Sequence, residues 1–108
     1  MPARTIDELL MDLDRLAAMF DEAATNGYPS GSYAAQAIRE RRTSLVERIA
    51  DGDDMEIAAR LLDMVPNAKD LDAIGFNIGR HPNIVALLDE LDTAAAEISF
   101  EYLGDEEE

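Results

Sequence analysis

The chain has 108 residues, of which 47% are hydrophobic and 31% charged, and its 24 acids against nine Lys and Arg give a net charge of −15. This length fits one domain, and the apolar content suffices for a core, which excludes an ordinary acidic disordered chain. The chain has no Cys, which excludes disulfides and thiolate chemistry, and its charge opposes direct binding to nucleic acid or to anionic membranes.

Apolar residues recur at helical spacing along the whole chain. The first predicted helix begins at Thr5, which forms a capping box with Glu8, and it ends at Gly27. Its apolar stripe comprises Ile6, Leu9, Leu13, Leu16, Ala17, Phe20 and Ala24. Such a stripe is typical of a helix that packs on a core.

A second helix is predicted over residues 33 to about 50, after turn residues at 28–32, with Ser32 as its N-cap. Its apolar face is thin and consists of Ala34, Ile38, Leu45 and Ile49. Arg41 and Arg42 flank this face, so their stems are expected to cover apolar surface while their guanidinium groups meet acids of neighbouring helices.

A third helix is expected to start at Asp53, with Glu56 in its first turn, and to reach Val65 before Pro66. Its inward residues would be Ile57, Ala58, Leu61 and Leu62.

A fourth helix is predicted from the cap Asn67 to Gly79. Its inward residues would be Leu71, Ile74, Gly75 and Ile78. In this interpretation Gly75 allows close contact with another helix.

The fifth helix has Pro82 in its first turn. Its apolar stripe contains Ile84, Leu87, Leu88, Leu91, Ala94, Ala95 and Ile98. Residues 99–103 either extend this helix or dock as a short extended segment, and residues 104–108 form an acidic disordered tail. The sequence therefore predicts an all-α fold: a single domain over residues 1–103, built as a compact bundle of about five short-to-medium helices.

Catalytic and metal-binding chemistry finds little support in the sequence. The chain has one His, and His81 precedes Pro82 at a helix start, where a loop or capping role fits better than catalysis. A calcium loop starting at Asp51 would need Gly at position six and Glu at position twelve, where Glu56 and Leu62 stand. We therefore expect no enzyme activity, no catalytic residue, no cofactor and no metal.

Acidic residues follow two of the predicted helices at seven-residue intervals. Asp7, Asp14 and Asp21 project from nearly one line of the first helix, about 10.5 Å apart. In the fifth helix Glu90 and Glu97 repeat this spacing. Asp89, Asp92 and Glu101 lie around them. Residues 81–108 contain nine acids and no base.

These acids predict a protein that binds a basic surface of a partner belonging to a nucleic-acid-binding complex, without binding nucleic acid itself. The predicted partner-binding residues are Asp7, Asp14, Asp21, Asp89, Glu90, Asp92, Glu97 and Glu101. Carboxylates at these intervals could stand near every third phosphate position of one DNA strand. A solvated polar face, or adaptation to a salt-rich environment, would also account for the acidity.

In small size, all-α pattern, acidity and lack of a cofactor motif, the chain resembles phage-encoded inhibitors of bacterial defence systems, the anti-CRISPR and anti-restriction proteins. The resemblance is one of composition and implies inhibition by DNA mimicry. The alternative is a structural or adaptor module, able to form homo-oligomers, in which acidity serves solubility. Its apolar surface would include Met11, Ala18, Val85, Ala86, Ala96 and residues 100–103. Without a signal peptide or a long apolar run, a cytoplasmic location and no membrane partner are expected.

Overall fold

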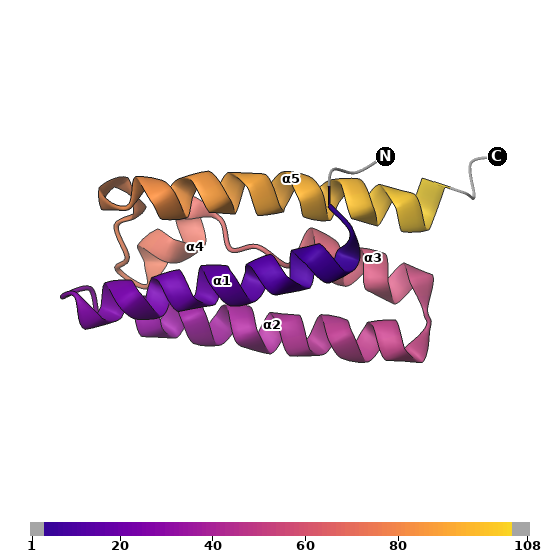
Figure 1. Ribbon diagram of the computed structural model, residues 1–108, viewed down its shortest axis with the longest axis horizontal. Coiled ribbons are helices and arrows are strands. Elements are labelled where there is room, and N and C mark those ends of the chain that lie inside the picture. The colour runs from indigo at the N-terminus through magenta and orange to yellow at the C-terminus, as the bar shows by residue number, and fades with distance from the viewer. Residues whose placement is uncertain (1–3, 105–108) are drawn as a thin grey trace.

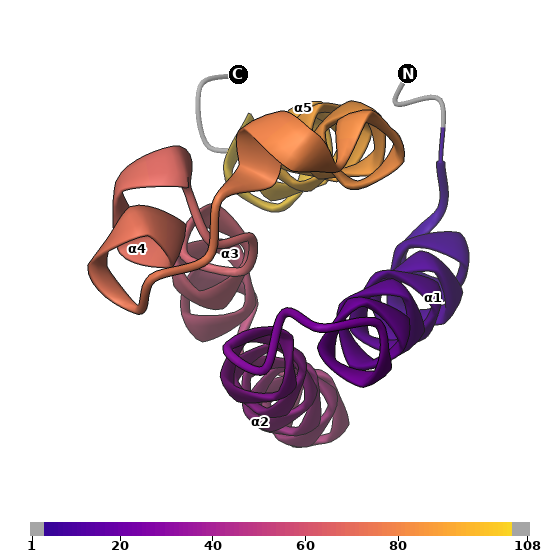
Figure 2. The same cartoon turned by 90° about the vertical axis from the view of Figure 1, so that its left-hand side faces the viewer.

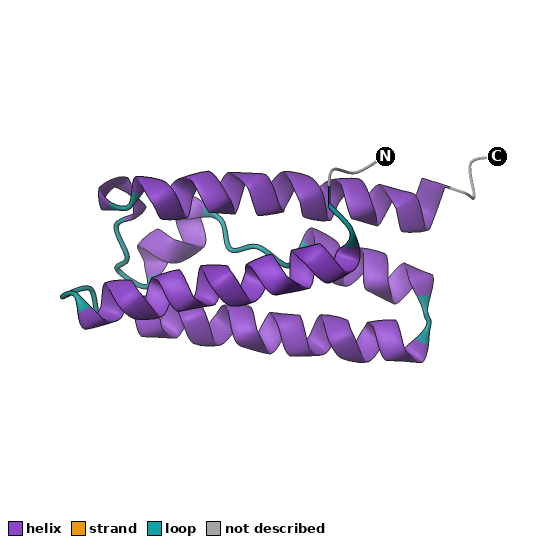
Figure 3. Cartoon of the chain, in the orientation of Figure 1, coloured by secondary structure: helices purple, strands orange, loops and turns teal. Residues whose placement is uncertain are grey.

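The computed structural model describes residues 4–104, and throughout this part of the chain the regular structure is helical (Figure 3). The elements are α1 (Ile6–Thr25), α2 (Gly31–Asp51), α3 (Asp54–Leu62), α4 (Ala68–Ala73), the short 3₁₀ helix η1 (Ile78–Arg80) and α5 (Pro82–Gly104). The prediction of an all-α bundle with five helices is confirmed.

Four of the helices run along one axis and alternate in direction (Figure 1). Seen from one end, α1 lies between α2 and α5, and α3 closes the ring between α2 and α5 (Figure 2). The helix α4 and η1 lie in the connection from α3 to α5, on the outside of the ring. The helix α3 is short, and α4 lies further along the bundle axis, toward the other end (Figure 1). The molecule is a rod of 49 × 23 × 22 Å.

The stripes predicted for the first and fifth helices supply much of the core, and α2, α3 and the α4 region supply the rest. Leu9, Leu13, Leu16 and Phe20 of α1 are fully buried. All seven predicted residues of α5, from Ile84 to Ile98, are buried as well. At the average value for buried apolar surface, each of the buried Leu, Ile and Phe side chains stabilises the fold by about 1.5–3 kcal/mol.

Side-chain caps begin three of the helices as predicted. The Thr5 hydroxyl accepts a hydrogen bond from the Glu8 N–H, and the Glu8 carboxylate accepts one from the Thr5 N–H. Asp53 accepts hydrogen bonds from two backbone N–H groups at the start of α3. Asn67 forms a capping box with Asp70 at the start of α4.

The predicted cap of the second helix is wrong. The helix begins two residues earlier, at Gly31, and the Ser32 hydroxyl donates to the Pro29 carbonyl instead of accepting from the helix. Gly31 is buried against α1, where a Cβ atom would collide with the carbonyl oxygen of Phe20. The start of α2 is therefore set by the close approach of its backbone to that of α1. The turn residues in the sequence do not reveal this contact.

The predicted third and fourth helices are both shorter in the structure. The third ends at Leu62, before Val65, and Leu62 is exposed rather than inward. The fourth ends at Ala73, and Gly75 follows with φ of +85°, a left-handed conformation that favours glycine. The predicted helix contact at Gly75 is wrong, because no atom lies within 4 Å of where its Cβ would be.

The α4 region buries different residues from those predicted. Leu71 is buried, but Ile74 is 41% exposed, and Phe76, which the apolar pattern did not select, is buried in its place. Ile78 belongs to η1 and is partly buried. The left-handed turn at Gly75 changes the direction of the chain, so the helical spacing used for the prediction does not apply beyond it.

Residues 99–103 extend the last helix, which also includes Gly104. The rest of the predicted tail, residues 105–108, lies outside the described part of the chain.

Candidate functional site

Two of the three residues in the acidic line of α1, Asp14 and Asp21, face α2, where arginines meet them. Arg39 Nη2 lies 2.7 Å from the Asp21 carboxylate, and Arg42 Nη2 lies 3.3 Å from that of Asp14. Arg42 also donates from Nε to the Leu10 carbonyl at 2.9 Å. The expectation that arginines of the second helix meet acids of a neighbouring helix is therefore confirmed for Arg42, whereas Arg41 forms no ion pair within residues 4–104. The pairs made by Arg39 and Arg42 neutralise Asp21 and Asp14, two of the three predicted binding residues of α1.

A second ion-pair group joins the N-terminal end of the described chain to α5. Arg4 donates from Nε to Asp12 at 2.7 Å and from Nη2 to Glu90 at 2.6 Å. These hydrogen bonds, first that to Glu90 and then that to Asp12, raise the pKa of Arg4, which stays charged. Glu90 therefore holds α5 against α1 as well as contributing to the acidic surface.

The two acidic lines do not share one face. On a helix that turns 100° per residue, Asp12 and Asp14 point in directions about 160° apart. Asp14 pairs with α2, whereas Asp12 shares Arg4 with α5. The acidic residues Asp14 and Asp21 thus lie on the flank of α1 toward α2, whereas the acidic line of α5 lies beyond the opposite flank of α1.

The α5 carboxylates form one line and two outliers. Glu97 and Glu101 project within about 20° of the direction of Glu90, over a length of about 16 Å on the side of α5 nearer α1. Asp92 points about 160° away, toward α3, and Asp89 lies between these directions. Within residues 4–104, Asp89, Asp92, Glu97 and Glu101 are exposed and make no ion pair, as is also true of Asp7.

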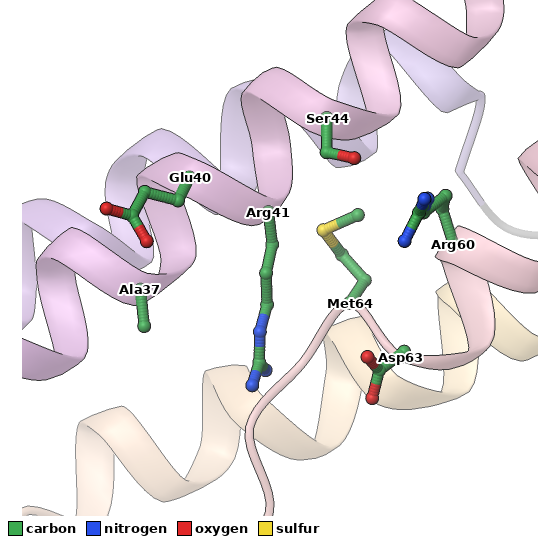
Figure 4. A pocket seen from close by; sticks show the side chains of 7 residues that line it. All are labelled: Ala37, Glu40, Arg41, Ser44, Arg60, Asp63 and Met64. Carbon is green, nitrogen blue, oxygen red and sulfur yellow. The ribbon is translucent and has the colours of Figure 1, made fainter.

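A hollow of about 330 Å³ lies between the middle of α2 and the end of α3 (Figure 4). Arg41 and Arg60 point into it beside Met64, and Glu40 and Asp63 stand at its sides. The two charges of each sign cancel in this lining, so the hollow favours neither an anion nor a cation. We assign no ligand to it.

His81 is part of an aromatic cluster at one end of the bundle. Its ring stacks on Phe76 with centroids 4.8 Å apart and meets the edge of Tyr28 at 4.5 Å. Its carbonyl accepts the N–H groups of Ile84 and Val85 at the start of α5. His81 lies in the loop before α5, as predicted, and its packing against Phe76 and Tyr28 was not visible in the sequence.

Residues 4–104 bring no three His, Asp or Glu side chains into a group that could hold a metal ion. None of the helices formed by these residues is both long and apolar enough to cross a bilayer.

By its fold the protein is an antiparallel all-α bundle with a carboxylate-rich final helix. No protein-family model matches the chain, and searches of the curated proteins and of the solved structures find no match. The chemistry of the surface therefore carries the functional interpretation.

Proposed function

We propose that this protein binds a basic surface of a partner protein through α5 and keeps nucleic acid from that surface. The observation that carries the proposal is the charge of α5, which has five carboxylates and no base over 23 residues. Four of the five make no ion pair within the described chain, whereas α2 neutralises much of the acidic line of α1. Long-range attraction would guide this helix to Lys and Arg side chains that otherwise hold phosphates.

The charge density of α5 limits the form of mimicry. The helix is about 34 Å long, and one strand of a duplex of that length carries about ten phosphates. Five carboxylates supply half of that charge and extend around two sides of the helix. This supports occupation of a basic groove by local charge complementarity rather than imitation of a whole duplex.

In this proposal the partner is a DNA-binding complex of a bacterial defence system, of the kind that anti-CRISPR and anti-restriction proteins inhibit, and the protein acts in the cytoplasm by binding, without catalysis. This proposal is based on the compositional resemblance to such inhibitors and on the acidity of α5.

Charge reversal on α5 tests the proposal. We expect the triple variant Asp92→Lys, Glu97→Lys and Glu101→Lys to weaken binding about tenfold or more, since exposed pairs contribute roughly 0.2–1 kcal/mol each and every reversal adds repulsion from the basic partner. Glu90 is left unchanged because it holds Arg4. The measurement is displacement of labelled duplex DNA from purified CRISPR effector complexes and restriction enzymes, at low and at moderate salt.

The matched control is the triple variant Glu22→Lys, Glu47→Lys and Asp72→Lys, which changes the net charge equally at exposed positions of α1, α2 and α4. We expect this control to keep most of the inhibition. Equal loss in both variants would show that only the overall charge matters, and unchanged inhibition by the α5 variant would contradict the proposal.

A second candidate function, that of an adaptor module, is favoured by the exposure of Phe100, which is 72% accessible. The predicted apolar surface is exposed at Met11, Ala18 and Ala86 and half-buried at Val85 and Ala96. An adaptor of this kind would bind in a salt-tolerant manner.

A further inference from the structure

An apolar strip follows the outer edge of the contact between α3 and α5. We name it the α3–α5 seam, and it comprises Met55, Ala59 and Leu62 of α3 and Ala96, Phe100 and Leu103 of α5. Three of these side chains are the most exposed large ones in their helices: Met55 at 62%, Leu62 at 64% and Phe100 at 72%. Burial against another surface would stabilise such side chains, so their joint exposure points to a binding surface.

Two observations show the register of α3 against α5. The Ser99 hydroxyl, which is buried, donates to the Ala58 carbonyl at 3.2 Å. Burial raises the pKa of Tyr102, and the charges of Asp54 and then Asp7 raise it further, which places Tyr102 near the start of α3. Because the helices are antiparallel (Figure 1), Phe100 lies level with the middle of α3, between Met55 and Leu62.

The direction of each side chain follows from the same hydrogen bond. At 100° per residue, Met55 and Leu62 point about 40–60° further from the core than Ala58, which contacts α5. Ala96 and Leu103 of α5 point about 40–60° beyond Ser99 in the same sense, and Phe100 about 100° beyond it. Met55, Leu62, Ala96 and Leu103 therefore line the solvent side of one seam, and Phe100 stands at its outer edge on α5.

Carboxylates surround this seam. Asp92 points toward α3 at one end of the seam, and Glu97 lies one turn from Phe100 on the far side of α5. Asp54 lies at the other end but on the core side of Ala58, near Tyr102. Arg60 is the base of α3, and it turns to the opposite flank, where it lines the hollow beside α2 (Figure 4). The rim thus presents negative charge around an apolar centre.

We infer that the α3–α5 seam binds a basic amphipathic helix of the partner protein, with the apolar face of that helix on Phe100 and its Lys or Arg residues on the carboxylate rim. The inference rests on the proposed function and adds the surface and the shape of the partner segment. An apolar centre with a charged rim is the usual arrangement of helix-in-groove recognition.

Charge also argues against two other occupants. A second copy of the chain would bring its own acidic seam against this one, and like charges at close range oppose association. A segment as acidic as residues 105–108 would likewise be opposed by the charge of this rim. Only a basic segment gains from both the apolar centre and the rim.

A designed peptide tests the inference on the full chain. The probe is a labelled helix of about 18 residues with Leu at i, i+3, i+4 and i+7 positions and Lys elsewhere. Two controls have the same length: a scrambled sequence of the same composition, and a version with Glu in place of Lys. Binding is measured by fluorescence anisotropy, and the site is mapped by amide chemical shifts.

We expect the Leu/Lys helix to bind and to shift amide signals of α3 and the second half of α5. The double variant Leu62→Ser and Phe100→Ser should weaken its binding about tenfold or more, as for central anchors of an interface. The matched control, Met11→Ser and Tyr33→Ser, removes side chains of similar exposure from α1 and α2 and should leave binding nearly unchanged.

The other possible results contradict the inference, in whole or in part. If the scrambled Lys peptide binds equally and the seam variant has no effect, the inference fails while the proposed function stands. If neither Lys peptide binds, both fail. Equal binding of the Glu peptide would overturn the basic character of the occupant. A dimer in light scattering that the seam variant makes monomeric would overturn the inference in favour of a second copy.

Discussion

The three phenylalanines of the chain have three different environments. Phe20 is fully buried in α1 and meets Phe76 edge-on, with ring centroids 5.0 Å apart. Phe76 packs there although it follows a left-handed turn, while Phe100 is exposed on α5. Helical periodicity identified Phe20 as core, missed Phe76 and left Phe100 undecided, because only Phe20 lies inside an uninterrupted amphipathic stripe.

This difference predicts the effect of truncation at each site. We expect Phe20→Ala to lower the free energy of unfolding by about 3–5 kcal/mol, since it removes a ring and leaves a cavity. Phe100→Ala removes the same atoms from solvent-exposed surface and should change stability by less than about 0.5 kcal/mol. Urea unfolding followed by circular dichroism measures both. A large loss in the Phe100 variant would show that this ring is packed, and would also remove the basis for the α3–α5 seam.

At the scale of helices, the contact between α1 and α2 combines a core with an ion-paired edge. Asp14 and Asp21 are seven residues apart on α1, so they lie along one edge and meet Arg42 and Arg39 of the antiparallel α2. The two pairs differ in their surroundings. Arg42 is more buried and also binds the Leu10 carbonyl, whereas Arg39 is half exposed.

We therefore expect Arg42→Met to cost about 1–1.5 kcal/mol of stability, mostly through the lost hydrogen bond. Arg39→Met should cost less than about 1 kcal/mol, and this effect should shrink further at high salt, where exposed pairs are screened. Both are measured by urea unfolding at low salt and at about 0.5 M salt. If the two arginines proved equally important and equally sensitive to salt, the distinction by burial would be incorrect.

At the scale of the molecule, acidity is distributed unevenly over a rod. Bases of α2 and Arg4 neutralise acids at the contacts of α1, while α5 has no base of its own. Ion pairs at the contacts between helices therefore help to hold the bundle together. The exposed carboxylates repel one another and oppose the compact state. The net charge of −15 therefore does not show that the acids of α5 are mostly unpaired while those at the contacts of α1 are neutralised.

This balance predicts the salt dependence of folding. We expect the melting temperature to rise between about 10 mM and 150 mM salt, where the screening length falls from about 30 Å to 8 Å, and then to level off. Calorimetry in NaCl measures this dependence, with sucrose at matched osmolality as the control. A rise that appears only at molar salt would indicate instead that the acidity is an adaptation to a salt-rich environment.

The sequence by itself determined the helical class, the caps at Thr5, Asp53 and Asn67, and the core stripes of the first and last helices. These features depend on spacing of three or four residues and on backbone groups close in the chain, so local reasoning reaches them. The start of α2 and the early end of α4 escaped it, because a close backbone approach sets the first and a left-handed glycine follows the second. The early end of α3 at Leu62 was also missed.

Only the tertiary structure decided how the acidic residues are used. Asp14 and Asp21 look equivalent to Glu97 and Glu101 in the sequence, yet the first two pair with α2 and the others remain exposed. The α3–α5 seam arises in the same way, from residues more than thirty positions apart. Helical periodicity tells which residues share an edge of one helix, but which helix packs against that edge depends on the arrangement of the whole bundle.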